Sequence, residues 1–197
     1  MPALWLAYPV LVHLAVITQM AALQSAALGW LGLLFLLPAL RSGKLWPWLA
    51  LAGVVLLSAI APTLGVGMIF LYLPPILMNA FLGLIFINSL RPGRTPMISA
   101  VARQIRGDLS PAVATYTRRS TQAWVLIFFS MALFSAALAL WADDALWSLF
   151  TNCLNYVIVV LIFLIEYLLR SVFLPNDPRT PVGEYVRGVV RTDFRKL

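Results

Sequence analysis

The chain has 197 residues, of which 62% are hydrophobic and only 11% are charged. Soluble globular domains carry about 45–50% apolar and roughly 25% charged residues, so the composition excludes that class. The single cysteine excludes a disulfide-stapled secreted scaffold, and the high hydrophobicity excludes a disordered chain. We therefore expect an all-α membrane protein, small enough for one helical bundle.

Long apolar segments in the first half of the chain predict four membrane-spanning helices. A helix that rises about 1.5 Å per residue needs about 20 apolar residues to cross the hydrocarbon, with a usable range near 17–25. Residues 1–40 carry no charge and are too long for one helix, so a break is expected near the polar residues 19–25. Residues 45–90 are also too long, and Pro62 with Gly65 supplies the break. The expected spans are 4–22, 26–40, 45–60 and 66–90.

Two further apolar segments follow a polar stretch, with Asp143 and Asp144 between them. They predict spans over 123–141 and 146–169. The predicted fold is thus a six-transmembrane-helix bundle over residues 1–170, with a cytoplasmic loop over 91–122 and a basic cytoplasmic tail over 171–197.

The 14 Lys and Arg residues, which leave a net charge of +7, indicate the orientation. With six spans they all lie on one side of the membrane, and the connections on the other side carry only the two aspartates. Because short cytoplasmic loops are enriched in Lys and Arg, both termini are expected in the cytoplasm. This distribution between apolar segments also argues against a nucleic-acid partner. The basic residues form three clusters: Arg41 and Lys44; Arg91, Arg94, Arg103, Arg106, Arg118 and Arg119; and Arg170, Arg179, Arg187, Arg191, Arg195 and Lys196.

Short amphipathic helices are expected on the cytoplasmic side. In the loop, apolar residues recur at helical spacing from Ile98 to Ile105, which predicts a helix lying in the membrane interface. Ser110-Pro111 predicts the start of a second helix that runs into the fifth span. A similar apolar spacing follows Thr180-Pro181 in the tail.

No sequence motif for a catalytic centre, a nucleotide, a zinc ion or an activated nucleophile is present. One histidine and one cysteine also exclude a multi-histidine metal site. We therefore expect neither a cofactor nor a metal, and the polar side chains within the spans become the candidate site residues.

His13, Asn79 and Asn155 lie at similar depths and could form a cluster near the membrane midplane, with Asn152 and Tyr156 flanking it. Hydrogen bonding between helices is the simpler alternative.

Glu166 is the only acid well inside a predicted span, and it precedes Arg170 by one helical turn. This i, i+4 spacing suits an interfacial salt bridge. The alternatives are proton relay or head-group binding.

Four arginines flank the ends of the fourth and fifth spans, namely Arg91, Arg94, Arg118 and Arg119. Antiparallel packing of those spans could bring them together as a site for an anionic head group or an acidic partner. General attraction to anionic lipid is the alternative.

Several segments resemble a family of bacterial integral-membrane proteins of about this length, which has no assigned activity. Members are found with fatty-acid-synthase-like enzymes of the aryl polyene pathway. The resemblance covers most of residues 5–170 and implies a bacterial inner-membrane location and a pathway, but no catalytic residue. The matching segments are Tyr8-Pro9 with His13, Arg91-Pro92-Gly93-Arg94-Thr95-Pro96, Tyr116-Thr117-Arg118-Arg119, residues 147–152, Leu154-Asn155-Tyr156 and Glu166-Tyr167.

The expected function is a non-catalytic inner-membrane component of a lipid-like biosynthesis or export pathway. Its expected partners are membrane lipids and an acyl carrier protein or cytoplasmic acyl-chain enzymes. Two alternatives stay open: a flippase-like transporter and a membrane-embedded acyl or prenyl transferase.

Overall fold

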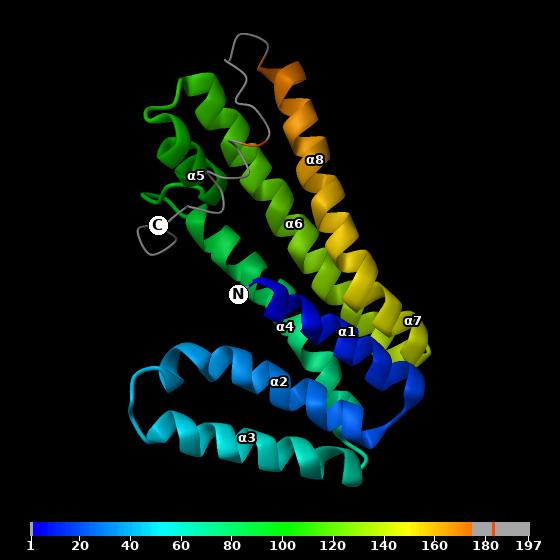
Figure 1. Ribbon diagram of the computed structural model, residues 1–197. Helices are drawn as coiled ribbons and strands as arrows, with labels where there is room; N and C mark the ends of the chain where they lie inside the picture. The colour runs from blue at the N-terminus through cyan, green and yellow to red at the C-terminus, as the bar shows by residue number, and fades with distance from the viewer. Residues whose placement is uncertain (1, 175–182, 184–197) are drawn as a thin grey trace. The chain divides into compact units, whose positions relative to one another are not determined.

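A computed structural model describes residues 2–174 and residue 183, and these residues form helices joined by short turns (Figure 1). The predicted tail helix after Thr180-Pro181 lies outside the described residues. The helices are α1 (Pro2–Thr18), α2 (Ala21–Leu40), α3 (Trp46–Thr63), α4 (Gly67–Ser89), α5 (Met97–Arg106), α6 (Pro111–Trp141), α7 (Asp144–Leu149), a π-helical turn η1 (Phe150–Leu154) and α8 (Asn155–Phe173).

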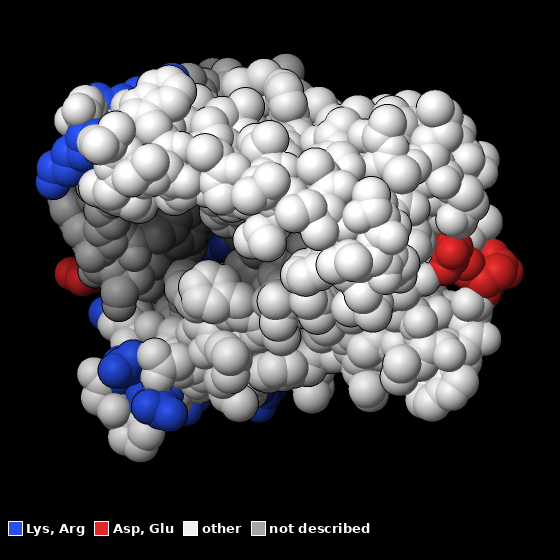
Figure 2. Space-filling view, turned by 90° about the horizontal axis from the view of Figure 1, so that it is seen from below, with Lys and Arg blue, Asp and Glu red and all other residues white. Residues whose placement is uncertain are grey.

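Five helical segments of the described chain are long and apolar enough to cross a membrane: α2, α3, α4, α6 and the run Asp144–Phe173. Most of the surface visible in Figure 2 carries no charged side chain, as lipid contact requires. These five segments confirm the prediction of an all-α, multi-pass membrane protein. The 17 residues of α1 stand at the lower limit for a spanning helix, so the sixth span stays a prediction.

One helix begins earlier than the sequence predicts, and another begins where Ser110-Pro111 predicts its start. The first break is at Gln19, whose backbone has a φ of 54°, and α2 begins at Ala21 instead of residue 26. The loop assigned to residues 91–122 ends in the first turns of α6, which begins at Pro111 as predicted and continues into the fifth span, with Ser110 Oγ accepting from the Val113 amide at 3.4 Å. Short polar side chains permit these helical turns when their hydroxyls bond to the helix backbone, as Thr121 does with the Thr117 carbonyl at 2.8 Å.

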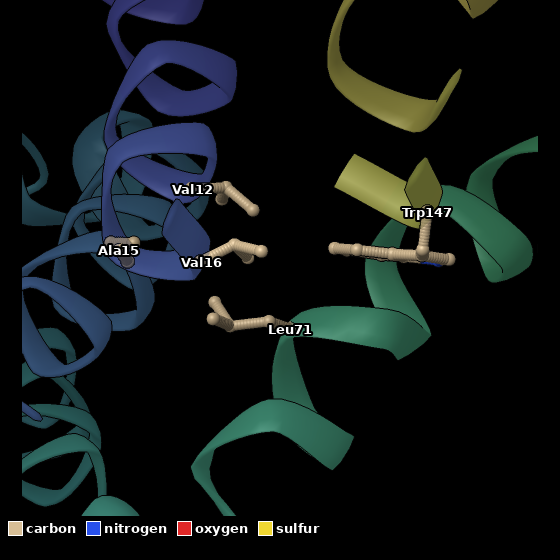
Figure 3. Packing of buried hydrophobic residues seen from close by; sticks show 6 residues of the cluster. Val12, Ala15, Val16, Leu71 and Trp147 are labelled. Carbon is tan, nitrogen blue, oxygen red and sulfur yellow. The ribbon is translucent and has the colours of Figure 1, made fainter. Parts of the chain in front are cut away.

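The chain divides into two compact units, which are described separately. The first unit is Met1–Leu77 with Leu133–Val157, and the second is Met78–Ala132 with Ile158–Leu197. In the first unit α2 packs against both α1 and α3. Its buried apolar cluster joins α1, α2, α4 and α7 through Val12, Ala15, Val16, Ala27, Leu71 and Trp147 (Figure 3).

In the second unit the amphipathic helix α5 packs against α6. The Ser99 and Thr117 hydroxyls are 2.7 Å apart, and the Ile98 amide donates to Thr121 Oγ1 at 3.2 Å. The helix predicted between Ile98 and Ile105 is therefore present. Its buried side, however, includes Ser99, because α6 offers it a hydroxyl partner.

Candidate functional site

A groove of about 700 Å³ lies between α6 and α8 in the second unit. The residues that line it recur every three or four positions along each helix, so each helix presents one face to the groove. They are Pro111, Ala112, Thr115, Tyr116, Arg119, Ser120, Ala123, Trp124 and Ile127 from the first helix, and Ile162, Ile165, Glu166, Leu169, Phe173 and Leu174 from the second helix and the residue after it.

The walls of the groove are largely apolar. Trp124 is buried and stacks at a tilt on Phe128 with ring centroids 5.3 Å apart, which fixes the wall on the side of α6. Ile127 and Ile162 line the end away from Pro111. A groove with such walls, opening from helices of a membrane protein, suits a hydrocarbon chain better than a polar solute.

Polar side chains gather in the middle of the groove. Ser120 Oγ donates to Glu166 Oε1 at 3.3 Å, and the Tyr116 hydroxyl donates to the Glu166 carbonyl at 3.1 Å. Arg119 also lines the groove and is exposed. Arg170 is buried one helical turn after Glu166. The site thus combines an exposed arginine with a carboxylate that accepts a hydrogen bond from Ser120.

The four predicted arginines have different surroundings. Arg119 faces the groove, whereas its neighbour Arg118 donates from Nη2 to the Leu90 carbonyl at 3.2 Å. That bond places Arg118 beside the turn after α4, where Arg91 and Arg94 are exposed. The structure therefore brings Arg118 to the same turn as Arg91 and Arg94, while Arg119 contributes to the groove.

In the first unit, His13 Nδ1 lies 2.9 Å from Ser148 Oγ, which joins α1 to α7. Asn152 Nδ2 donates to the same Oγ at 3.1 Å. Ser148 Oγ therefore contacts both His13 on α1 and Asn152 in η1. Ser148 has no exposed surface, so this hydroxyl forms part of the packed interior.

Three other predicted intramembrane residues lie on α8 and α4. Asn155 is half-buried and Tyr156 is exposed, both at the start of α8. Asn79 is buried in the second unit, in α4.

The sequence pattern did not predict Ser148 as a partner of His13, nor Asp144 as a partner of Tyr72 and Gln19. Asp144, at the start of α7, accepts from the Tyr72 hydroxyl and, at 3.3 Å, from Gln19 Nε2. Its position directly after an apolar span was the available signal, but its partners on α4 and in the turn after α1 are distant in sequence.

Within the part of the chain that the structure describes, no group of three or more His, Cys, Asp or Glu side chains could hold a metal ion. Comparison with protein-family models, with curated proteins and with solved structures finds no match to this chain.

Proposed function

We propose that the chain is a non-catalytic inner-membrane component of a pathway that makes or exports a lipid-like product. In this proposal it holds an acyl or polyene chain in the groove between α6 and α8. The observation that carries the proposal is the groove itself, whose apolar walls enclose about 700 Å³ and whose middle carries Arg119 and Glu166. Apolar walls with a few convergent polar groups are typical of sites that bind an amphiphile.

The position of the groove along α6 supports this proposal. The first turns of α6 carry hydroxyls and arginines, whereas the turns from Ala123 onward are apolar. The groove spans this transition, so a bound amphiphile could place its head beside Arg119 and its chain between Trp124 and Ile162. Such a transition along a helix is typical of a membrane interface.

The basic clusters support a cytoplasmic orientation for the groove's polar end and both termini, by the positive-inside rule. They also support an acidic partner, such as an acyl carrier protein or cytoplasmic acyl-chain enzymes. The aryl polyene pathway is proposed on the sequence resemblance alone. A sixth crossing by α1 belongs to the same proposal.

A membrane-embedded acyl or prenyl transferase is the second candidate, because Glu166 and Arg119 line one groove. A carboxylate next to an anion-binding arginine is an arrangement that group transfer could use. Turnover of an acyl donor by the purified protein would favour this candidate over a holding role.

Photocrosslinking tests the proposed function. The purified protein in phosphatidylcholine nanodiscs is irradiated with a diazirine-bearing fatty acid, and the labelled peptides are mapped by mass spectrometry. We expect labels on groove residues of α6 and α8. Ala123→Trp should fill the groove and remove most of the label, whereas Leu126→Trp, on an exposed side of the same helix, should not. Equal labelling of both variants and the wild type would contradict the proposal.

A further inference from the structure

We propose that the groove selects an anionic amphiphile that carries a hydroxyl close to its charged group. This inference rests on the proposed function and adds the head-group chemistry. Arg119 would bind the anionic group, and Glu166 would accept a hydrogen bond from the hydroxyl. The two side chains line the same groove, one from each of its walls.

The charges in and beside the groove favour an anionic ligand. Arg119 and Glu166 line it, and Arg170 is buried one helical turn after Glu166. Two arginines and one carboxylate therefore lie in and beside the groove, so the sum of their charges is positive. A guanidinium binds phosphate or carboxylate oxygens with two parallel hydrogen bonds, so a single anionic group is the complementary ligand.

Glu166 adds the requirement for a hydrogen-bond donor. A carboxylate has about four acceptor positions, and the hydroxyls of Ser120 and Tyr116 fill at most two of them. Further acceptor positions are therefore available to a molecule in the groove. A neutral hydroxyl fits this position better than an ammonium, because Arg119 and Arg170 already make the charge in and beside the groove positive.

Occupancy by an amphiphile also follows from the groove's two kinds of wall. Trp124 and Ile127 are apolar and would not bind a free ion. Arg119 and Glu166 are charged and would not bind a plain hydrocarbon. A head group and a chain on one molecule satisfy both parts of the groove.

Native mass spectrometry with three dioleoyl lipids tests the inference. Phosphatidylglycerol is anionic and has hydroxyls, phosphatidylmethanol is anionic without them, and phosphatidylcholine is zwitterionic without them. We expect the wild type to retain phosphatidylglycerol about tenfold more than either other lipid, since a charge-assisted hydrogen bond at each group supplies that order of discrimination.

Each side chain should control one comparison. Arg119→Gln should lower the retention of both anionic lipids relative to phosphatidylcholine, and Glu166→Gln should lower only the retention of phosphatidylglycerol, the lipid with hydroxyls. Arg103→Gln is the matched control, because Arg103 is an exposed arginine on α5 outside the groove. Thermal unfolding of each variant shows whether it keeps the fold, and Glu166→Asp gives a second variant with a carboxylate if Glu166→Gln unfolds.

The outcomes separate the inference from the proposed function. Equal losses in Arg119→Gln and Arg103→Gln would show diffuse surface attraction and overturn the inference. If Ala123→Trp removes lipid while Arg119→Gln and Glu166→Gln change nothing, the proposed function stands and the inference fails. Crosslinks from benzoylphenylalanine at Ile165 to the chain's own residues 175–197, with none to lipid, would identify the tail as the occupant and overturn it.

Discussion

At the residue scale, two adjacent arginines illustrate how one helical step changes a side chain's role. Arg118 donates to the Leu90 carbonyl just after α4, and Arg119, rotated by about 100° on the same helix, faces the groove. A cation near the carboxyl end of a helix stabilises it by about 0.3–1 kcal/mol at exposed sites. Arg118 therefore contributes to the stability of the fold, and Arg119 contributes to the proposed ligand site.

Arg118→Ala should lower the free energy of unfolding by about 0.5 kcal/mol, because the Leu90 carbonyl loses a charged donor. Arg119→Ala should leave that free energy unchanged. Unfolding of both variants by sodium dodecyl sulfate, followed by circular dichroism, provides the comparison. Equal destabilisation by both substitutions would show that their positions on the helix are energetically equivalent.

The contact between His13 and Ser148 predicts a coupling energy. Hydrogen bonds between membrane helices contribute about 0.6–2 kcal/mol. A double-mutant cycle of His13→Ala and Ser148→Ala should therefore give a coupling in this range, measured by the same unfolding method. Ser130→Ala, an exposed serine on α6, is the control and should show no coupling with His13→Ala. If the two substitutions lower the free energy of unfolding additively, the contact between His13 and Ser148 has no coupling energy.

At the element scale, close packing of α2 on α3 depends on a small residue. A Cβ atom added at Gly32 would overlap Val54 Cγ1, and a β-branched valine has little rotamer freedom with which to move away. Gly53, in the same helix pair, has no atom within 4 Å of an added Cβ. The two glycines therefore form a matched pair for substitution.

Gly32→Ala should destabilise the protein by about 1–3 kcal/mol, the usual cost of forcing an extra group into a packed interface. Gly53→Ala should be neutral or stabilise by up to about 1 kcal/mol, because alanine favours the helix. Thermal unfolding in detergent measures both. A wild-type midpoint for Gly32→Ala would mean that α2 and α3 separate without cost.

At the scale of the whole molecule, contacts within the first unit bear on topology. Gln19, in the turn between α1 and α2, donates to Asp144 at the start of α7. The Gln24 side chain, near the start of α2, packs against Gly67 at the start of α4, where it occupies the position of an added Cβ atom. These helix ends thus lie together, while Arg41 and Lys44 follow the opposite end of α2, as alternating crossings require.

Reporter fusions test the six-span topology. Fusions after Lys44, Gly107 and Leu197 should report a cytoplasmic location, and one at Asp143 a periplasmic location. A cytoplasmic reporter at the amino terminus would show that α1 crosses, since its end at Thr18 would then lie outside. A periplasmic carboxyl terminus, or a periplasmic amino terminus, would reject six spans.

The sequence by itself determined the membrane class and the positions of most turns, because these depend on local hydrophobicity and on residues such as Pro62 and Gly65. It also identified Glu166 and Arg119 as candidates. Only the tertiary structure decided that these two share one groove and that Ser148 pairs with His13. Those relations join residues far apart in the chain, and they depend on helix rotation, which a uniformly apolar segment does not specify.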